Sequence, residues 1–228
     1  MKTIAVAGIS GYTGKRLLPL LSDCNLRLLV RPPTAAKAPW KGDARVVAVE
    51  CNDAKALEPH LRGVDEIVCI VGTTRAQFKD GNSYEAVDIG IPRSLAQAGK
   101  KAGVKKIHLL TSVGAGSGVG AYMKAKKEAE DAVRGSGLAY TIIRPSGIVG
   151  EGRRAFQFGD VFVSPLTHVP GLKSAAWKYH SIPAERLAAI FATLTRTDQY
   201  DGKILEGEIL QKMELLGPAD EAARVSIS

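Results

Sequence analysis

Short apolar segments of β-prone residues alternate with helical segments along most of the chain, and this alternation constrains the fold most. The strand-like segments are apolar at successive positions, which is typical of parallel strands covered by helices on both faces. The pattern predicts an α/β protein with a doubly wound, mostly parallel sheet and right-handed crossovers. The strand-like segments are residues 3–8, 26–30, 44–50, 66–72, 106–112 and 139–145, and the helical ones are 14–23, 53–63, 83–103 and 121–137.

The alternation breaks at residues 31–42, where three prolines predict a loop or a short turn. Residues 148–181 are rich in glycine, proline and aromatic residues and have no clear period. Residues 181–196 are predicted to be a helix with Ser181 as its cap and Pro183 in its first turn. Residues 202–210 are predicted to be a last short strand.

The chain contains no internal repeat and no composition typical of a flexible linker between domains. We therefore expect one domain over residues 1–216, with a small C-terminal segment, residues 145–205, carrying the loops on the substrate side. Residues 217–228 are expected to form a loosely ordered tail.

Composition excludes several classes of function. No run approaches the roughly 18 apolar residues that cross a membrane, and the first residues lack a signal-peptide pattern. Three cysteines and four histidines show neither disulfide nor metal-ligand spacing. The formal net charge is +8, but the basic residues stand in small groups that are typical of solvated helix faces. We expect a reduced, cytoplasmic protein without a metal, with neither a membrane nor a nucleic acid as its partner.

Three glycines at intervals of three residues follow the first strand-like segment. Gly8 ends this segment, Gly11 lies in the turn, and Gly14 is expected to open the first helix and to pack against the strand. A tight turn would explain the glycines, but their position between a strand and a helix favours a nucleotide pyrophosphate on the helix start. Further contacts to phosphate or ribose are expected from Ser10, Tyr12 and Thr13.

The residue after the second strand-like segment bears on the choice of nucleotide. Enzymes that prefer NAD usually place a carboxylate there, whereas this chain has Arg31. A guanidinium favours a 2′-phosphate through charge and bidentate hydrogen bonds, so NADP(H) is predicted over NAD(H). The alternative is that Arg31 stacks on adenine. Lys15 and Arg16 are either further phosphate contacts or exposed residues.

A Tyr-Lys pair follows the fifth strand-like segment. Tyr122 and Lys126 are four residues apart and therefore lie on one face of a helix. A neighbouring ammonium group, together with the positive nicotinamide ring, is expected to lower the pKa of Tyr122, so that it can exchange a proton with a substrate oxygen. Ser112, at the strand end, is expected to hydrogen-bond that oxygen. Chance occurrence of the pair on an ordinary amphipathic helix is the alternative interpretation.

With these motifs, the chain resembles the atypical short-chain dehydrogenases/reductases with an NAD(P)-binding Rossmann fold. It is most similar to the Tat-interacting-protein-like oxidoreductases and the NmrA-like proteins, over most of residues 1–210. The resemblance rests on "GISGYTG", "LRGVDEIVCIVGTTR", "LAQAGKKAGVKKIHLLTSVGA", "YMKAK" and "IIRPSGIVG". It implies cofactor contacts from Glu50, Cys51, Gly72, Thr73, Thr74, Arg75, Thr111, Pro145, Ser146, Gly147 and Ile148, besides Tyr122 and Lys126.

The chain also departs from that family. Ser112 precedes Tyr122 by fewer residues than usual, so Thr111 or Ser117 is an alternative source of the hydroxyl. Asp88 stands where related enzymes often have asparagine. These departures concern the proton relay and leave cofactor binding untouched.

The function predicted from the sequence is an NADP-dependent carbonyl reductase or alcohol dehydrogenase, monomeric or homodimeric. Alternatives are a non-catalytic NADP(H) sensor of the NmrA-like type and an assembly factor with a structural nucleotide. A small carbonyl compound, apolar or aromatic, is the expected substrate, and Arg153 and Arg154 would suit an anionic one. Five aromatic residues are expected to form the wall of an apolar substrate pocket; the alternative is that they fill a small core beneath an irregular loop. They are Phe156, Phe158, Phe162, Trp177 and Tyr179.

Overall fold

The computed structural model describes residues 1–73, 83–151 and 179–218. A seven-stranded sheet in the order β3-β2-β1-β4-β5-β6-β9 forms its centre, and every neighbouring pair in it is parallel. This topology confirms the predicted doubly wound Rossmann fold. The strands are β1 (Thr3–Ala7), β2 (Asn25–Val30), β3 (Val46–Ala48), β4 (Glu66–Cys69), β5 (Lys106–Leu110), β6 (Ala139–Arg144) and β9 (Lys203–Glu206).

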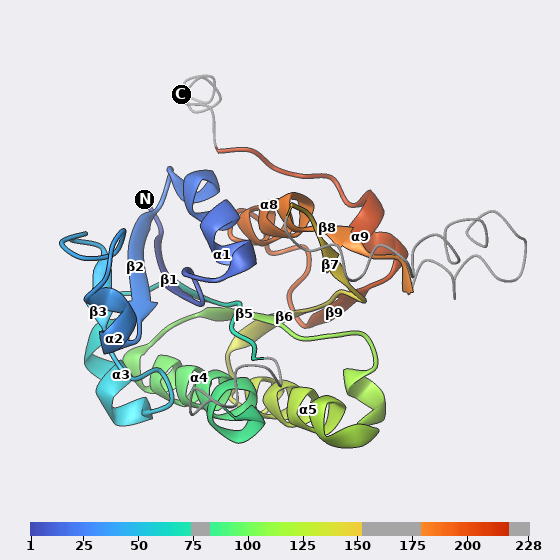
Figure 1. Cartoon of the computed structure of the whole chain (residues 1–228), viewed down its shortest axis with the longest axis horizontal. Helices are drawn as coiled ribbons and strands as arrows, with labels where there is room; N and C mark the ends of the chain where they lie inside the picture. The colour runs from blue at the N-terminus through green and yellow to red at the C-terminus, as the bar shows by residue number, and fades with distance from the viewer. Residues whose placement is uncertain (74–82, 152–178, 219–228) are drawn as a thin grey trace, which may run out of the picture.

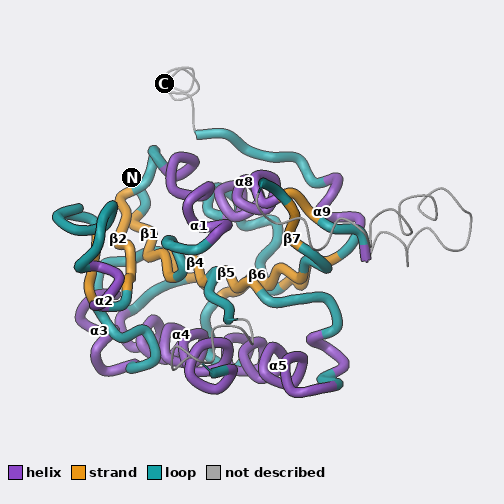
Figure 2. The backbone as a smooth tube through the Cα atoms, in the orientation of Figure 1, coloured by secondary structure: helices purple, strands orange, loops and turns teal. Residues whose placement is uncertain are grey.

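Helices cover both faces of the sheet. In Figure 1, α1 and α8 lie on one side of it and α4 and α5 on the other, and Figure 2 shows the strands running between these two layers. The helices are α1 (Tyr12–Leu17) with its 3-10 continuation η1 (Leu18–Leu21), α2 (Pro32–Ala35), α3 (Ala54–Leu61), η3 (Tyr84–Ile89, a π-helix), α4 (Gly90–Ala102), η4 (Ala115–Ser117, 3-10), α5 (Gly120–Arg134), α8 (Ala184–Leu194) and α9 (Glu208–Lys212).

Alternate residues of β1 enter two separate apolar cores. Ile4 and Val6 pack on the side of α1 and α8, where Phe191 is fully buried. Ala5 and Ala7 pack on the other side with the helices α3, α4 and α5. Because successive strand side chains point to opposite faces, a strand covered on both faces must be apolar throughout.

Two local predictions need correction. Ser181 does not cap a helix, because the Ile182 N–H donates to Gly147 O at 2.8 Å and draws Ile182–Pro183 into a short strand, β8, beside β7 (Ile148–Val149). Helix α8 begins only after Pro183. The last strand ends at Glu206, since Gly207 turns the chain with a φ of 66° into helix α9. Residues 32–35 form one turn of helix, as the predicted loop or short turn allows.

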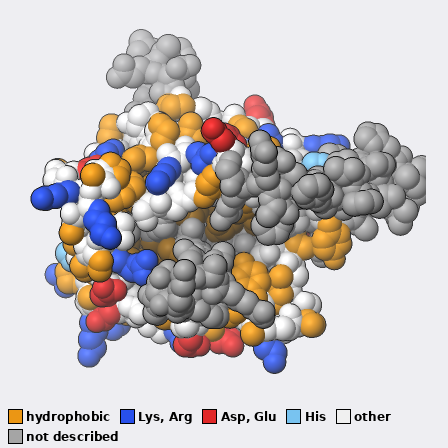
Figure 3. Space-filling model, viewed as in Figure 1, with side chains coloured by type: hydrophobic (Ala, Val, Ile, Leu, Met, Phe, Trp, Pro, Cys, Tyr) orange, Lys and Arg blue, Asp and Glu red, His pale blue; other side chains and the backbone are white. Residues whose placement is uncertain are grey.

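Among the described residues, no helix is long and apolar enough to cross a membrane. Lys and Arg side chains are scattered over the face shown in Figure 3, with acidic side chains among them. This distribution matches the small basic groups noted in the sequence.

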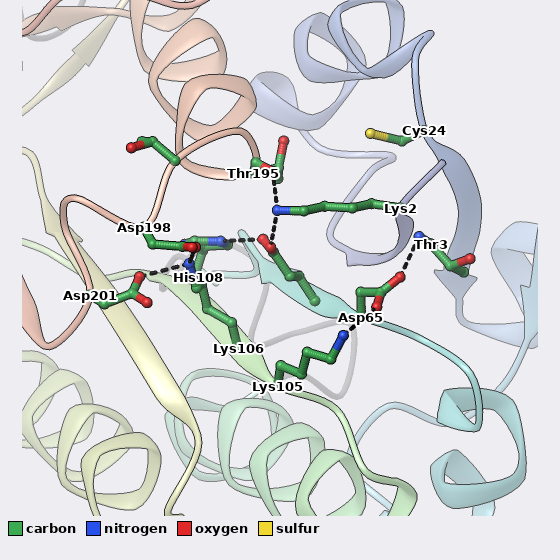
Figure 4. Close-up of polar contacts among 12 residues, drawn as sticks. Lys2, Thr3, Cys24, Asp65, Lys105, Lys106, His108, Thr195, Asp198 and Asp201 are labelled. Carbon is green, nitrogen blue, oxygen red and sulfur yellow. Dashed lines mark hydrogen bonds and ion pairs between the residues drawn. The ribbon is translucent and has the colours of Figure 1, made fainter. Parts of the chain in front are cut away.

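The amino end of the sheet holds a buried polar cluster (Figure 4). Glu66, at the start of β4, accepts from Lys2 Nζ at 2.6 Å and lies 2.9 Å from Nε2 of the fully buried His108. Because a carboxylate oxygen can only accept, His108 Nε2 carries the proton in this contact. Lys106 is nearly buried and pairs with Asp198 and with Asp201. These contacts tie β1, β4 and β5 to the turn before β9.

Glu66→Gln tests the stabilising role of this cluster. Burial works to raise the pKa of Glu66, but the hydrogen bond and charge of His108 and the contact with Lys2 together lower it from 4.5. A lowered folded-state pKa stabilises the fold above the unfolded pKa, and this contribution is lost as the pH falls through the folded value. We expect Glu66→Gln to reduce the free energy of unfolding by about 2 kcal/mol near neutral pH.

Urea denaturation of the wild type and the variant across the acid range measures this effect. The stability lost in Glu66→Gln, relative to the wild type, should become smaller as the pH falls below 4.5. Glu58→Gln is the control, because Glu58 only faces the exposed Arg62 across 3.7 Å. If both substitutions changed the free energy of unfolding equally across this pH range, Glu66 would have no special role in stability toward acid.

Candidate functional site

Two adjoining cavities of about 260 and 340 Å³ lie at the carboxyl ends of the strands. They share Gly11 and the segment from Ile70 to Thr73 as lining, so they form two halves of one groove. Between them the strand order reverses, because β1 has β2 on one side and β4 on the other. In doubly wound sheets, this switch point is where nucleotides bind.

The glycine loop forms the floor where the two cavities meet. Gly8 has a φ of 97°, and a Cβ there would lie 2.8 Å from the backbone of Ile70. Gly14 lies within the first turn of α1 and would place a Cβ 2.4 Å from Gly8 O, so it packs on this loop and not on a strand. Gly11 is the N-cap of α1, with no side chain over the helix start. The loop is therefore shaped for close approach of a phosphate to the main chain.

Arg31 and Cys51 line the first cavity together with Ser10. Arg31 stands at the carboxyl end of β2, as N-cap of α2, and its side chain is exposed. Cys51 is buried, and burial raises the pKa of its thiol to about 11. Glu50 is exposed and lies next to Cys51 without lining the cavity.

Tyr12 and Thr13 line the second cavity, but the basic residues that follow them turn away from it. The Tyr12 hydroxyl donates to Glu151 O at 2.9 Å. Arg16 stacks over the Tyr12 ring at 4.0 Å and pairs with Glu185 at 2.6 Å. Neither Lys15 nor Arg16 lines either cavity, so the exposed alternative describes them better.

Tyr122 and Lys126 face the second cavity from helix α5, and Ser112 faces it from the loop after β5. The sequence predicted that these three residues share a site, and the fold brings them together. Lys126 Nζ lies 5.5 Å from the centre of the Tyr122 ring. The ring of Tyr84, from η3, packs against Tyr122 with 5.4 Å between ring centres.

Lys126 forms a buried ion pair with Asp88. Their Nζ and Oδ1 atoms are 2.8 Å apart, and the two side chains are 5% and 0% exposed. The other carboxylate oxygen of Asp88 accepts the Thr73 N–H at 3.3 Å. Asp88 thus links helix α5 to the loop after β4, at the junction of the two cavities.

The pKa of Tyr122 is raised from its ordinary value of 10.0, contrary to the prediction. Burial is the largest cause, because it disfavours the charged phenolate. Lys126 and a hydrogen bond with Ser112 do act to lower the pKa, as expected, but Asp88 and Tyr84 raise it further. The sequence could not show that the charge of Lys126 has a carboxylate beside it.

The three candidate hydroxyls have different surroundings. The Thr111 hydroxyl donates to Glu130 Oε1 at 2.7 Å, and Ser117, which lines neither cavity, donates to Gly114 O at 2.7 Å. The Ser112 hydroxyl lines the second cavity beside Tyr122, to which it is hydrogen-bonded, and its contact to its neighbour's carbonyl is long, 3.4 Å. Ser112 therefore has the hydroxyl best able to donate into the cavity.

Glu130 is a member of this site that the sequence reasoning missed. It lies one turn after Lys126 on α5, is 2% exposed, and binds Arg144 at 2.5 and 2.8 Å. Arg144 ends β6 and immediately precedes the turn from Pro145 to Ile148. The position four residues after Lys126, on the same helix face, was the available signal.

The turn from Pro145 to Ile148 lines the second cavity in full. It is held to the loop after β5 by the Val113 N–H, which donates to Pro145 O at 3.0 Å. Ser146 donates its hydroxyl to His180 O at 2.7 Å. These bonds place the turn opposite Tyr122 across the cavity.

Several predicted residues lie outside the described residues: Thr74, Arg75, Arg153, Arg154, Phe156, Phe158, Phe162 and Trp177. Tyr179 is described and is 58% exposed. Within the described ranges, no group of three or more His, Cys, Asp or Glu side chains is arranged to hold a metal ion.

The fold and the groove define an NAD(P)-binding Rossmann protein. The chain belongs to the NAD(P)H-binding family, whose sequence profile matches residues 8–168. This match covers the glycine loop, Arg31, Tyr122, Lys126 and the turn after β6. The resemblance to NAD(P)-binding Rossmann proteins seen in the sequence is therefore confirmed.

Named relatives include oxidoreductases. The chain is 29% identical over 156 residues to the mitochondrial protein FMP52 of Debaryomyces hansenii, which covers 66% of this chain and 68% of that protein. It is 26% identical over 152 residues to a ceramide reductase of Caulobacter vibrioides, 65% of this chain and 47% of the relative. An NADPH-dependent quinone oxidoreductase of Escherichia coli, solved with NADPH, shares the fold with a TM-score of 0.62 and 21% identity, over 89% of this chain and 68% of that one.

Gly14→Ala tests the shape of the glycine loop. A methyl group there meets Gly8 O and the Ile9 backbone at 2.4 to 2.6 Å, so the loop must shift. We expect a loss of about 3 kcal/mol in the free energy of unfolding from the overpacking, and a loss of NADPH affinity.

The matched control is Gly42→Ala, which has a φ of 84° but open space around it. It should cost only about 1 kcal/mol, from backbone strain, and leave NADPH affinity unchanged. Urea denaturation and fluorescence titration measure the two effects. Full NADPH affinity in a folded Gly14→Ala variant would show that the phosphate does not rest on this loop.

Proposed function

We propose that the protein is an NADP(H)-dependent oxidoreductase of the short-chain dehydrogenase/reductase type that interconverts a carbonyl compound and an alcohol. The observation that carries this proposal is the grouping of Ser112, Tyr122 and Lys126 around one cavity beside the glycine loop. A protein that only sensed the dinucleotide would need the loop but not this grouping. The relative named as a ceramide reductase supports reduction as the chemistry.

The groove residues suit a dinucleotide. The loop from Gly8 to Gly14 would hold the pyrophosphate, because Gly11 lines both cavities and leaves the start of α1 without a covering side chain. The cavity with Arg31 and Cys51 would take the adenosine half, and that with Tyr122 and Lys126 the nicotinamide half. When bound, the nicotinamide supplies or accepts the hydride.

The protein residues manage the proton and the substrate oxygen. Tyr122 Oη donates its proton to the oxygen of a carbonyl substrate, or takes one from an alcohol in the reverse direction. The Ser112 hydroxyl donates a hydrogen bond to the same oxygen and orients it. Lys126 lies beneath the Tyr122 ring and would also hold the nicotinamide ribose. Glu130 positions the site, because it binds both Thr111 and Arg144.

Arg31 supports NADP(H) as the preferred cofactor. It follows β2 directly, lines the adenosine cavity and presents an exposed guanidinium there. Such a group binds a 2′-phosphate with charge-assisted hydrogen bonds that a ribose hydroxyl cannot match.

Tyr122→Phe tests the enzymatic role. The variant keeps the ring that packs on Tyr84 and removes only the hydroxyl, so we expect loss of turnover by at least about 100-fold with NADPH affinity nearly unchanged. A screen of apolar and aromatic carbonyl compounds, followed by NADPH absorbance, provides the activity. Unreduced turnover in Tyr122→Phe would remove Tyr122 from the mechanism. NADPH binding without turnover of any compound by the wild type would favour a sensor.

Arg31→Asp tests the cofactor preference. Replacing the guanidinium by a carboxylate removes a favourable charge and adds a repulsive one at the 2′-phosphate, but leaves the ribose of NADH a hydrogen-bond acceptor. We expect NADPH affinity to fall about 100-fold and NADH affinity to change by less than about 3-fold. Arg27→Asp is the control, because Arg27 lies on β2 itself and is bonded to the carbonyls of His60 and Arg62. Equal losses for NADPH and NADH would mean that Arg31 does not contact the 2′-phosphate.

A further inference from the structure

We propose that Asp88 cancels the charge of Lys126 at Tyr122 and so holds Tyr122 as a neutral phenol, which sets the site for reduction of a carbonyl group. The cancellation of charge stands on the geometry alone. The consequence for the direction of the reaction rests on the proposed function.

Asp88 and Lys126 form one neutral unit. Their charged atoms are 2.8 Å apart and both side chains are almost completely removed from water. Water therefore cannot screen one charge without the other, and any group at the distance of Tyr122 meets the fields of both. A buried ammonium group with a carboxylate in contact acts as a dipole and not as a single positive charge.

Asp88 is fixed in this position. It belongs to η3, a π-helix that leads into α4, and π-helical turns displace side chains from regular helical positions. Its other oxygen is bound by the Thr73 N–H from the loop after β4. Gly72 lies against the pair, because a Cβ added at Gly72 would lie 3.6 Å from Lys126 Nζ and 3.8 Å from Asp88 Oδ1. The carboxylate is thus held by main chain on one side and by Lys126 on the other.

Four groups from the described elements around Tyr122 act on it. Its own helix contributes Lys126, η3 contributes Asp88 and Tyr84, and the loop after β5 contributes Ser112. The only fully charged groups among these four are Lys126 and Asp88, and they have opposite sign. Burial is the largest influence on the pKa of Tyr122 and raises it, ahead of the opposed influences of Lys126 and Asp88.

A neutral phenol is the form that donates a proton. In the reductive direction, the O–H bond of Tyr122 breaks and an O–H bond forms on the substrate oxygen, whose carbon receives the hydride of the reduced cofactor. The electron pair left on Oη makes a phenolate, which solvent water reprotonates. In the oxidative direction, the site would need this phenolate at the outset, and at neutral pH a buried phenol rarely supplies it.

The charge of the pair is tested by titrating Tyr122 in the full-length protein. The tyrosinate ultraviolet absorbance of each protein is compared with that of the same protein carrying Tyr122→Phe, and the difference gives the pKa of Tyr122. In Asp88→Asn, the amide keeps the shape and the oxygen that accepts from Thr73, but Lys126 acts alone. We expect the pKa of Tyr122 to fall by about 1 or more.

The double variant Asp88→Asn/Lys126→Met removes both charges and leaves no unpaired charge to impair folding. Its Tyr122 pKa should equal that of the wild type within about 0.5, because the pair it replaces is neutral. Glu85→Gln is the control, since Glu85 lies on the same helix η3 but is exposed and faces Arg93 at 3.6 Å. It should leave the pKa unchanged.

Two results would overturn the proposal. One is an unchanged Tyr122 pKa in folded Asp88→Asn. The other is a double variant whose Tyr122 pKa rises by about 1 or more, which would show that Lys126 acts as an uncompensated charge in the wild type. Neither readout uses turnover, so a failure of the proposed enzymatic function is seen separately, as NADPH binding without activity. If a substrate is found, the oxidation rate of Asp88→Asn should extend to lower pH than that of the wild type.

Discussion

The parallel pairing of β1 with both β2 and β4 is the constraint on which the rest of the structure depends. It forces the connections after β1 and β4 to leave the sheet toward opposite faces, so the carboxyl edge opens between them. The glycine loop occupies one side of that opening, and the segment from Ile70 to Thr73 occupies the other. Gly8 lies against the backbone of Ile70, so the two sides touch at their base. The groove exists because strand order, and not a special loop, separates its walls.

Features carried by local spacing could be predicted from the sequence. The strand-and-helix alternation predicted the sheet, the interval between Gly8, Gly11 and Gly14 predicted the loop, and the four-residue spacing placed Tyr122 and Lys126 together. Each of these depends on residues within one or two elements. The same local reasoning failed at Ser181, because a strand pairing with a residue more than thirty positions earlier, Gly147, outweighed a suitable helix-capping pattern.

The buried carboxylates could not be predicted, since their partners come from distant elements. Glu66 meets His108 from the next strand in the sheet, Asp88 meets Lys126 across two helices, and Glu130 meets Arg144 from β6. In the sequence each of them is an ordinary acidic residue in a helix or at the start of a strand. Each of these buried carboxylates needs its partner, because a carboxylate removed from water without one is strongly destabilising. For the same reason, the direction in which the pKa of Tyr122 shifts could not be derived from the spacing of Tyr122 and Lys126.

The ion pair of Asp88 also bears on the binding of a phosphate-rich ligand. Asp88 lies where the two cavities join, next to Gly72 and Thr73, which line both of them. An isolated carboxylate there would repel a pyrophosphate held at Gly11, because the two groups carry charge of the same sign. Pairing with Lys126 removes most of this repulsion, whereas an unpaired Lys126 would attract the phosphates and draw negative charge toward Tyr122. A neutral pair therefore adds no net charge where the two cavities join, which suits both the anion binding and the proton donation that we propose, and neither residue alone suits both.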